Sequence, residues 1–148
     1  MSASRIKGFT LIELMVAVAV LAILAALAFP SFQGTLRSNR IATTTNELLA
    51  SISMARSEAI RSTHGGGVCS SADAKACGGD WNSGCLVWTD SNANEALDDT
   101  EPVIRYVQPK ARLLISGSDT PIAFDSRGRS ASGEQEISLH PEGDIAEP

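Results

Sequence analysis

A long apolar run fills the start of the chain. Between residues 9 and 29 only Thr10 and Glu13 are polar. A helix of these 21 residues is about 31 Å long at ~1.5 Å per residue, which is enough to cross the core of a bilayer. The pattern therefore predicts a membrane-spanning helix over residues 9–29. Glu13 conflicts with it, because a charge in lipid costs about 2.5–3.5 kcal/mol at mid-membrane and less near the edge.

A second helical pattern follows Pro30, a residue that disrupts helix interiors. Apolar side chains recur at spacings of three, four and seven, which is typical of an amphipathic helix. They are Ile41, Leu48, Leu49, Ile52, Ala55, Ala59 and Ile60. The pattern predicts an amphipathic helix over residues 30–62, with its clearest part from about residue 35. The glycine run at 65–67 ends it, and its apolar stripe packs on the protein's own sheet.

From Val68 onward the pattern changes to short β-like runs separated by Gly, Asn and Asp clusters. The candidate strands are residues 85–89, 103–108, 112–116, 121–125 and 136–140. The links between them are short, which favours an antiparallel sheet. One helix on such a sheet is an α+β fold. A chain of 148 residues has room for one modest domain and an anchor. We therefore expect a long N-terminal helix, with a transmembrane half and an amphipathic half, packed on a β-rich head over residues 63–148.

The charge balance limits the function classes. The chain has 12 Lys and Arg against 17 Asp and Glu, for a formal net charge of −5. Loss of Arg5 and Lys7 by cleavage after Gly8 would leave 10 − 17 = −7. A body this acidic does not coat nucleic acid by bulk charge. The two histidines have no evident nucleophile partner and no phosphate-binding glycine motif follows a strand, so we expect no enzymatic activity and no cofactor.

Three interpretations of the N-terminus compete. A secretory signal accounts for the basic start at Arg5 and Lys7 and for a small-residue cleavage site at 26–28. The apolar run is longer than the usual 7–15 residues of such a signal, and it contains a carboxylate. A plain membrane anchor accounts for the length of the run but leaves Glu13 unexplained.

The third interpretation explains the whole segment. Gly8-Phe9-Thr10-Leu11-Ile12-Glu13, preceded by basic residues and followed by the apolar run, resembles a type IV prepilin without a gap. The resemblance covers about 25 residues. It implies that residues 1–8 are a leader, that a membrane prepilin peptidase cuts between Gly8 and Phe9, and that the new Phe9 amine is methylated. It also implies that Glu13 meets the N-terminal amine of a neighbouring subunit, which would relieve the cost of its charge in lipid.

A second, looser resemblance covers residues 50–105. The octapeptide that starts at Met54, a cysteine loop, a Trp, Gly84 and an Asp-x-Asn-x-Asn turn resemble minor pilins and pseudopilins of the GspH/FimT kind. Cys85 stands where these proteins often carry an aromatic, and no cysteine follows it. A pilin-like fold is implied, with one span in the bacterial inner membrane, a periplasmic head, and later incorporation into a pilus or pseudopilus beside other pilin or pseudopilin subunits.

The resemblance implies a structural role rather than catalysis. The first hypothesis is a minor pilin of a type IV pilus that primes or caps filament assembly. The alternative is a minor pseudopilin at the tip of the type II secretion pseudopilus. A third hypothesis, from a different class, is a plain membrane-anchored periplasmic binding module.

The cysteines suggest a disulfide. Cys69, Cys77 and Cys85 include no Cys-x-x-Cys pair, and histidine is scarce, so a structural zinc site is not expected. A bridge in an oxidising compartment fits better. We favour Cys69–Cys77, which closes a small loop, because Cys85 lies in an apolar run where a buried thiol is common.

An oxygen-rich loop offers a candidate calcium site. Its side chains stand at positions 1, 3, 5, 9 and 12 of a calcium loop: Asp90, Asn92, Asn94, Asp98 and Glu101. The sixth position, normally Gly, is Glu95, and the flanks are β-like. Asn and Asp also favour turns by bonding to their own backbone. A plain hairpin loop is therefore favoured, with calcium binding as the alternative.

A glycine-arginine turn offers a candidate contact for DNA. Arg127 and Arg129 flank Gly128, and two guanidinium groups on a turn suit phosphate. A turn of this kind is implicated in DNA uptake in some minor pilins that resemble this chain. Arg105, Lys110 and Arg112 would extend the patch if their strands were adjacent. The competing interpretation is a solvated turn with charges that protect strand edges.

Overall fold

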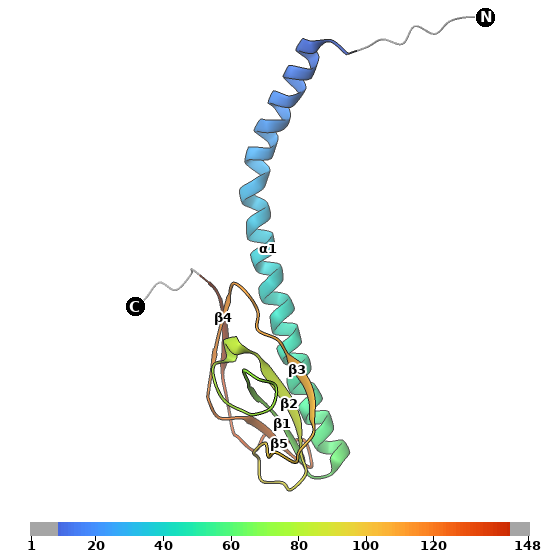
Figure 1. Cartoon of the computed structure of the whole chain (residues 1–148), viewed down its shortest axis with the longest axis vertical. Helices are drawn as coiled ribbons and strands as arrows, with labels where there is room; N and C mark the ends of the chain where they lie inside the picture. Colours follow the sequence, from blue (N-terminus) through green and yellow to red (C-terminus); the bar gives the residue numbers. More distant parts are fainter. Residues whose placement is uncertain (1–8, 143–148) are drawn as a thin grey trace, which may run out of the picture. The chain divides into compact units, whose positions relative to one another are not determined.

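The computed structural model describes residues 9–142, without the side chains of Pro30 and Ser31. The chain divides into two units, Met1–Ser38 and Asn39–Pro148, which are described separately below. Figure 1 shows the elements in sequence order. They are α1 (Leu11–Ser62), β1 (Gly65–Ser70), the short 3-10 helix η1 (Trp81–Ser83), β2 (Cys85–Asp90), β3 (Val103–Val107), β4 (Leu113–Gly117), β5 (Ile122–Asp125) and β6 (Ile137–Pro141).

The first unit contains the start of α1. The helix is continuous from Leu11 to Ser62, so its backbone passes Pro30 without a break. Every residue from 9 to 29 is exposed. An 18-residue window of this helix has a mean hydropathy of 2.8 and no buried residue, which makes it long and apolar enough to cross a membrane. This unit therefore has an apolar surface that nothing in the described part of the chain covers.

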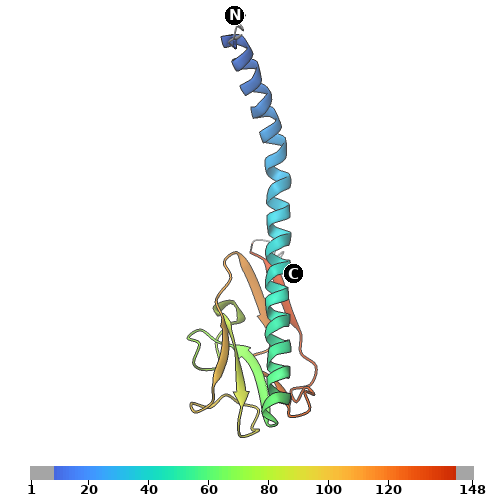
Figure 2. The ribbon, with the colours of Figure 1, turned by 90° about the vertical axis from the view of Figure 1, so that its right-hand side faces the viewer.

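The second unit contains two antiparallel sheets packed with the end of α1 (Figure 2). The larger sheet has the order β3-β2-β1-β5, and the smaller pairs β4 with β6. The α+β prediction is confirmed, and each of the five predicted strands lies within one residue of its predicted bounds. The single predicted sheet is in fact two, because β4 pairs only with β6 among the described strands.

Strand β1 is the element that the sequence analysis missed. We expected a loop at the glycine run, but Gly65, Gly66 and Gly67 form half of a central strand that pairs with both β2 and β5. A Cβ on Gly66 would lie 3.0 Å from the Ala55 carbonyl oxygen, and one on Gly67 would lie 2.3 Å from the Trp88 ring. The glycines are therefore needed for space, since α1 lies on one face of β1 and an indole ring on the other.

The same close approach determines which helix residues are buried. Ser51, Ala55 and Ala59 are completely buried against the sheet, while the larger Leu48 and Ile52 pack beside them. Leu49 and Ile60, which we placed in the buried stripe, are 55% and 50% exposed. The prediction is wrong for these two because, at about 100° per residue, they lie to one side of the helix face that Ser51, Ala55 and Ala59 form.

Helix η1 joins the two sheets. The Trp81 indole N–H donates to the Ser118 carbonyl oxygen at 2.9 Å, and the Asn82 side-chain oxygen accepts the Ile115 N–H at 2.6 Å. Trp81 is 4% exposed and belongs to the main core together with Val87 and Ile115. The core therefore extends from α1 across both sheets.

A partly buried carboxylate links α1 to β2. Glu58 accepts the Thr89 hydroxyl at 3.0 Å and the Arg61 Nε–H at 2.7 Å, and its side chain is 12% exposed. The hydrogen bond from Arg61 lowers the pKa of Glu58 below its ordinary value of 4.5; partial burial opposes this shift and the Thr89 hydroxyl adds to it. The carboxylate is therefore held in its charged form.

Loss of this carboxylate should destabilise the protein in a pH-dependent way. The pKa of Glu58 is lower in the folded state, so its contribution is present above pH about 4.5 and is lost as the pH falls through the folded pKa. We expect Glu58→Gln to lower the melting temperature at pH 7 and to differ little from wild type well below pH 4.5. Thermal denaturation across this range measures it, with the exposed Glu134→Gln as control. A difference that does not vary with pH would contradict the assignment.

Alanine at Gly67 should destabilise the head. The new methyl group would overlap the buried Trp88 ring, and overpacking of this kind costs about 1–3 kcal/mol. Gly34→Ala is the matched control, because nothing lies within 4 Å of the added atom and alanine favours a helix. Chemical denaturation of the detergent-solubilised protein measures both. A Gly67→Ala variant as stable as wild type would contradict the packing described here.

Candidate functional site

The start of α1 holds the residues expected to act in assembly. Phe9 and Thr10 are outside the helix, and Glu13 is in its first turn. The Thr10 hydroxyl oxygen accepts the Glu13 backbone N–H at 3.3 Å. A carboxylate in the first turn is favoured by the unpaired N–H groups at the helix start, typically by 0.3–1 kcal/mol. Glu13 thus has some compensation within its own helix. Gly8 lies outside the described residues, so cleavage, methylation and the pairing of Glu13 stay predictions.

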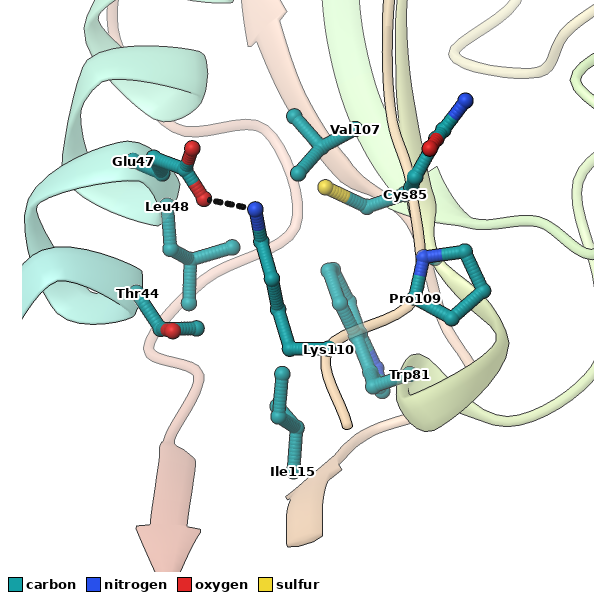
Figure 3. A pocket seen from close by; sticks show the side chains of 11 residues that line it. Thr44, Glu47, Leu48, Trp81, Cys85, Val107, Pro109, Lys110 and Ile115 are labelled. Atoms are coloured by element: carbon teal, nitrogen blue, oxygen red, sulfur yellow. Dashed lines mark ion pairs between the residues drawn. The ribbon is translucent and has the colours of Figure 1, made fainter. Parts of the chain in front are cut away.

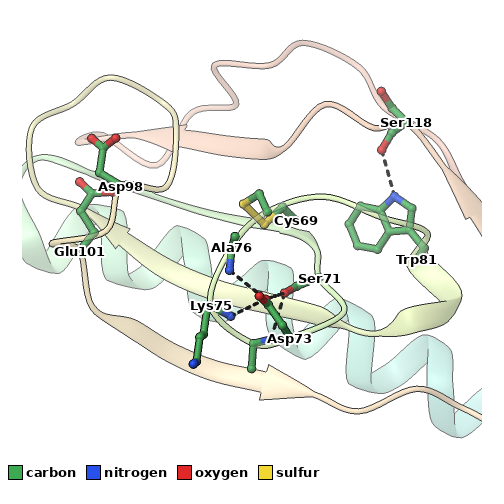
Figure 4. The surroundings of a disulfide bond; sticks show 11 residues. Cys69, Ser71, Asp73, Lys75, Ala76, Trp81, Asp98, Glu101 and Ser118 are labelled. Atoms are coloured by element: carbon green, nitrogen blue, oxygen red, sulfur yellow. Dashed lines mark hydrogen bonds between the residues drawn. A yellow bond between two sulfur atoms is a disulfide. The ribbon is translucent and has the colours of Figure 1, made fainter.

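The predicted disulfide between Cys69 and Cys77 is present (Figure 4). It closes a loop whose turn is organised by Asp73. This carboxylate accepts the backbone N–H groups of Lys75 at 2.9 Å and Ala76 at 3.1 Å. Those two hydrogen bonds lower the pKa of Asp73. The loop is therefore fixed both by the covalent bond and by a charged turn.

The register of β1 and β2 explains why Cys85 is left out. Cys69 is paired with Leu86, and Ser70 is paired with Cys85. Successive residues of a strand point to opposite faces, so Cys69 and Cys85 lie on different faces of the sheet. Cys85 belongs to the core under α1, is 5% exposed, and burial raises the pKa of its thiol. A thiol of this kind is unreactive.

A small apolar cavity lies beside Cys85, between α1, η1 and the end of β3 (Figure 3). Its volume is about 20 Å³, which is room for about one water molecule. The side chain of Lys110 extends across it and its Nζ lies 2.6 Å from Glu47 Oε2. The cavity is too small for an organic ligand, and Lys110 is engaged in an ion pair rather than facing solvent alone.

The candidate calcium residues do come together in one loop. Their side-chain oxygens, however, mainly accept hydrogen bonds from the backbone and side chains of that same loop. Asp90, which is 3% exposed, accepts the N–H groups of Ala93, Asn94 and Glu95. Glu101, which is 8% exposed, accepts the N–H groups of Ser91 and Asp98.

The remaining loop side chains bond to one another. Asp98 accepts from the side-chain amides of Asn92 and Asn94. Within the described part of the chain, no group of three His, Cys, Asp or Glu side chains is placed to hold a metal. These bonds favour the hairpin-loop interpretation, and calcium binding stays a prediction.

The candidate basic residues do not form one patch. Arg105 is on β3 and the arginine turn follows β5, and these strands are opposite edges of the larger sheet. Lys110 pairs with Glu47, and Arg112 directly precedes β4 in the smaller sheet. The adjacency that a joint patch requires is therefore missing.

The arginine turn has a structural explanation. Asp125 accepts the backbone N–H groups of Arg127 and Arg129, each at 2.9 Å, and also the Arg129 guanidinium. Gly128 has a positive φ of 71°, and a Cβ there would lie 2.7 Å from Ile60 Cδ1, so the turn packs on α1. DNA contact at this turn stays a prediction, with Arg127 as the exposed arginine whose side chain does not bind Asp125.

Comparison with known protein families gives two matches, which together cover most of the chain. A family model described as Type II transport protein GspH matches residues 44–146. The chain belongs to the GspH family. A second model, the prokaryotic N-terminal methylation motif, matches residues 3–29. A search of curated proteins gives no match, and neither does a search of solved structures.

Membership of the GspH family settles the general role. With the methylation motif, it makes the chain a minor pilin or pseudopilin of a type IV pilus or a type II secretion system. Such proteins are structural subunits rather than enzymes, and they assemble with other subunits after processing by a prepilin peptidase. The motif and the exposed apolar helix fit an anchor in the inner membrane.

Two structural features at the candidate sites were not predicted from the sequence. The Glu47–Lys110 ion pair joins residues 63 positions apart (110 − 47), and no local signal marks it. The Thr10 cap did have a signal, since Thr-x-x-Glu before an apolar run is a capping box.

Removal of the disulfide should cost a moderate part of the stability. Cys69 and Cys77 are separated by eight residues, and a loop of that size corresponds to about 2–3 kcal/mol of chain entropy. We expect Cys69→Ser with Cys77→Ser to lower the free energy of unfolding by that amount. Mass analysis of the unreduced, unfolded and alkylated wild type should find only Cys85 alkylated. Alkylated Cys77 beside a bridged Cys85 would contradict the structure.

Proposed function

We propose that this GspH-family protein is a minor subunit that primes or caps a pilin-type filament. One observation supports the proposal above the others. Residues 9–29 are exposed and apolar, whereas the head buries its own core around Ser51, Ala55 and Ala59. The head has a buried core of its own, and the N-terminal segment has none within the described residues. In this proposal the membrane covers the segment first and neighbouring subunits cover it later, with the head in the periplasm.

The type II secretion pseudopilus is the filament that we favour. The matched family is described as a type II transport protein. DNA contact at the arginine turn would favour a type IV pilus that takes up DNA, but Arg129 is bonded to Asp125 and Lys110 to Glu47. Two of the charges on which that argument depended are thus compensated within the protein. A minor pilin of a type IV pilus is the alternative.

Deletion of the gene separates the two filaments. A pseudopilin predicts that substrates of type II secretion accumulate in the periplasm while surface pili are retained. A minor pilin predicts the loss of pili with secretion intact. Complementation with the full chain is the control. A deletion that leaves both secretion and piliation unchanged would contradict the proposed function.

Glu13 should be needed for assembly but not for insertion. In the proposed filament the Glu13 carboxylate pairs with a neighbouring subunit's amine. Glu13→Ala would leave that amine without a partner, and an unpaired charge at the membrane edge costs somewhat less than about 2.5–3.5 kcal/mol. We expect Glu13→Ala to insert and to be cleaved as wild type does, and to incorporate at roughly one tenth of the wild-type level or less. Immunoblots of membrane and sheared-filament fractions measure this.

The control for that experiment changes an acid in the head. Glu134 is exposed, and Glu134→Ala should incorporate normally. Normal incorporation of Glu13→Ala would show that the carboxylate has no partner, and would contradict its role in assembly.

A further inference from the structure

The larger sheet has one edge that its own chain covers and one that it does not. Along β5, the Ala131 N–H donates to the Ala123 carbonyl oxygen and the Asp125 N–H to the Arg129 carbonyl oxygen, each at 2.9 Å. Residues 129–132 therefore cover that edge. At the other edge β3 pairs with β2 alone, and no further described residue bonds to the backbone of β3. Strand β3 thus presents unpaired N–H and C=O groups on its outer side.

The open edge also carries apolar side chains. Val103 and Ile104, the first two residues of β3, are 37% and 41% exposed. Among the described residues of the head, Leu49 and Ile60 on α1 are the other large apolar side chains exposed to this extent. Proteins usually protect a free edge with charges, prolines or a covering loop, because the edge is a template for another chain. Two exposed apolar residues favour the addition of a strand instead.

Arg105, the central residue of β3, determines which strand fits there. Within the described part of the chain its guanidinium has no ion pair. Side chains directly opposite each other on neighbouring strands are close enough for opposite charges to attract and for like charges to repel. Two copies joined antiparallel about the centre of β3 would place Arg105 against Arg105. The edge therefore suits a strand with a carboxylate opposite this residue.

A second copy of the chain has no free strand of that kind. Among the described strands only β2 and β5 carry a carboxylate, as Asp90 and Asp125. Strand β2 is paired on both sides, and residues 129–132 cover β5. The occupant that fits is therefore a different protein that offers an extended, acidic segment.

We propose that β3 is a docking edge for a different subunit of the same filament, which adds an extended segment to the four-stranded sheet. The backbone of the segment pairs with β3, a carboxylate of the segment faces Arg105, and its apolar side chains meet Val103 and Ile104. This inference rests on the proposed function, and it names the surface of the head that holds the subunit beside its neighbour. In strand addition of this kind the main-chain bonds supply the affinity and the side-chain pairs supply the specificity.

Full-length variants in cells that assemble the filament test the charge. We expect Arg105→Glu to incorporate about fivefold less than wild type, because it turns an attractive pair into a repulsive one, and Arg105→Lys to stay within about twofold. Ile104→Lys should lose at least as much as Arg105→Glu, since a charge then replaces an apolar contact at the edge. Immunoblots of membrane and sheared-filament fractions measure incorporation, and the Cys69–Cys77 bridge, found by mass, reports a folded head.

The control adds the same charge away from the edge. Thr120 is exposed in the link between β4 and β5, and Thr120→Lys should incorporate normally. An equal loss in Thr120→Lys would mean that incorporation responds to any added charge, and would overturn the inference.

A photo-reactive side chain locates the contact. With p-benzoylphenylalanine at position 104, illumination of the cells should cross-link the chain to another subunit of the filament, at a segment that contains a carboxylate. The same side chain at position 120 should not give this product. Mass analysis of the cross-linked peptides identifies both partners.

The outcomes separate this inference from the proposed function. A wild-type chain that is absent from the filament fraction overturns the proposed function, and the inference with it. Wild type and Arg105→Glu that both incorporate normally overturn the inference alone, because the charge then only guards the edge, which a glutamate does equally well. A cross-link from position 104 only to a second copy, or only to proteins outside the filament, overturns the choice of partner.

Discussion

The close approach of α1 to β1 is the contact on which the head depends. The strand contributes glycines and the helix contributes Ser51, Ala55 and Ala59, so two backbones meet with little side chain between them. Strand β1 pairs with β2 on one side and with β5 on the other, so the position of β1 against α1 also sets the positions of these two strands. The Trp88 ring then fills the space over Gly67 on the opposite face. Larger side chains in the glycine run would separate the layers rather than enlarge the core.

The two parts of α1, before and after residue 39, differ in what covers their apolar side chains. From residue 39 on, the helix belongs to the head, and its inward face is covered by strands of its own chain. Before that point its apolar side chains have no cover within the described residues. The head thus has a core of its own, and in the proposed filament the N-terminal segment is left for lipid or for other subunits.

Much of this architecture was readable in the sequence, since it is encoded by local patterns. The apolar run, the amphipathic helix and the five polar-flanked strands each follow from periodicity over a few residues. The glycine strand did not, because glycine is a turn signal locally and only the packing of α1 and Trp88 makes it a strand. Leu49 and Ile60 were misplaced for another reason, since apolar spacing alone does not say which face of the helix meets the sheet.

The candidate sites also differ in whether local sequence patterns or tertiary contacts determine them. The small disulfide loop could be inferred from the short spacing of Cys69 and Cys77 and from the apolar run around Cys85. The basic patch could not be, because it depended on which strands are neighbours, and the sheet places β3 and β5 at opposite edges. The partners of Lys110 and Arg129 are likewise set by tertiary contacts and by the detailed shape of a turn.

The alternation of cysteines between the two faces of the sheet has a consequence for maturation. Three thiols allow three single bridges, and two of these use Cys85. Once β1 and β2 are paired, Cys85 is enclosed under α1 while Cys69 and Cys77 meet on the far side. In the folded chain the strand register therefore permits one bridge, between Cys69 and Cys77, and keeps Cys85 on the other face of the sheet.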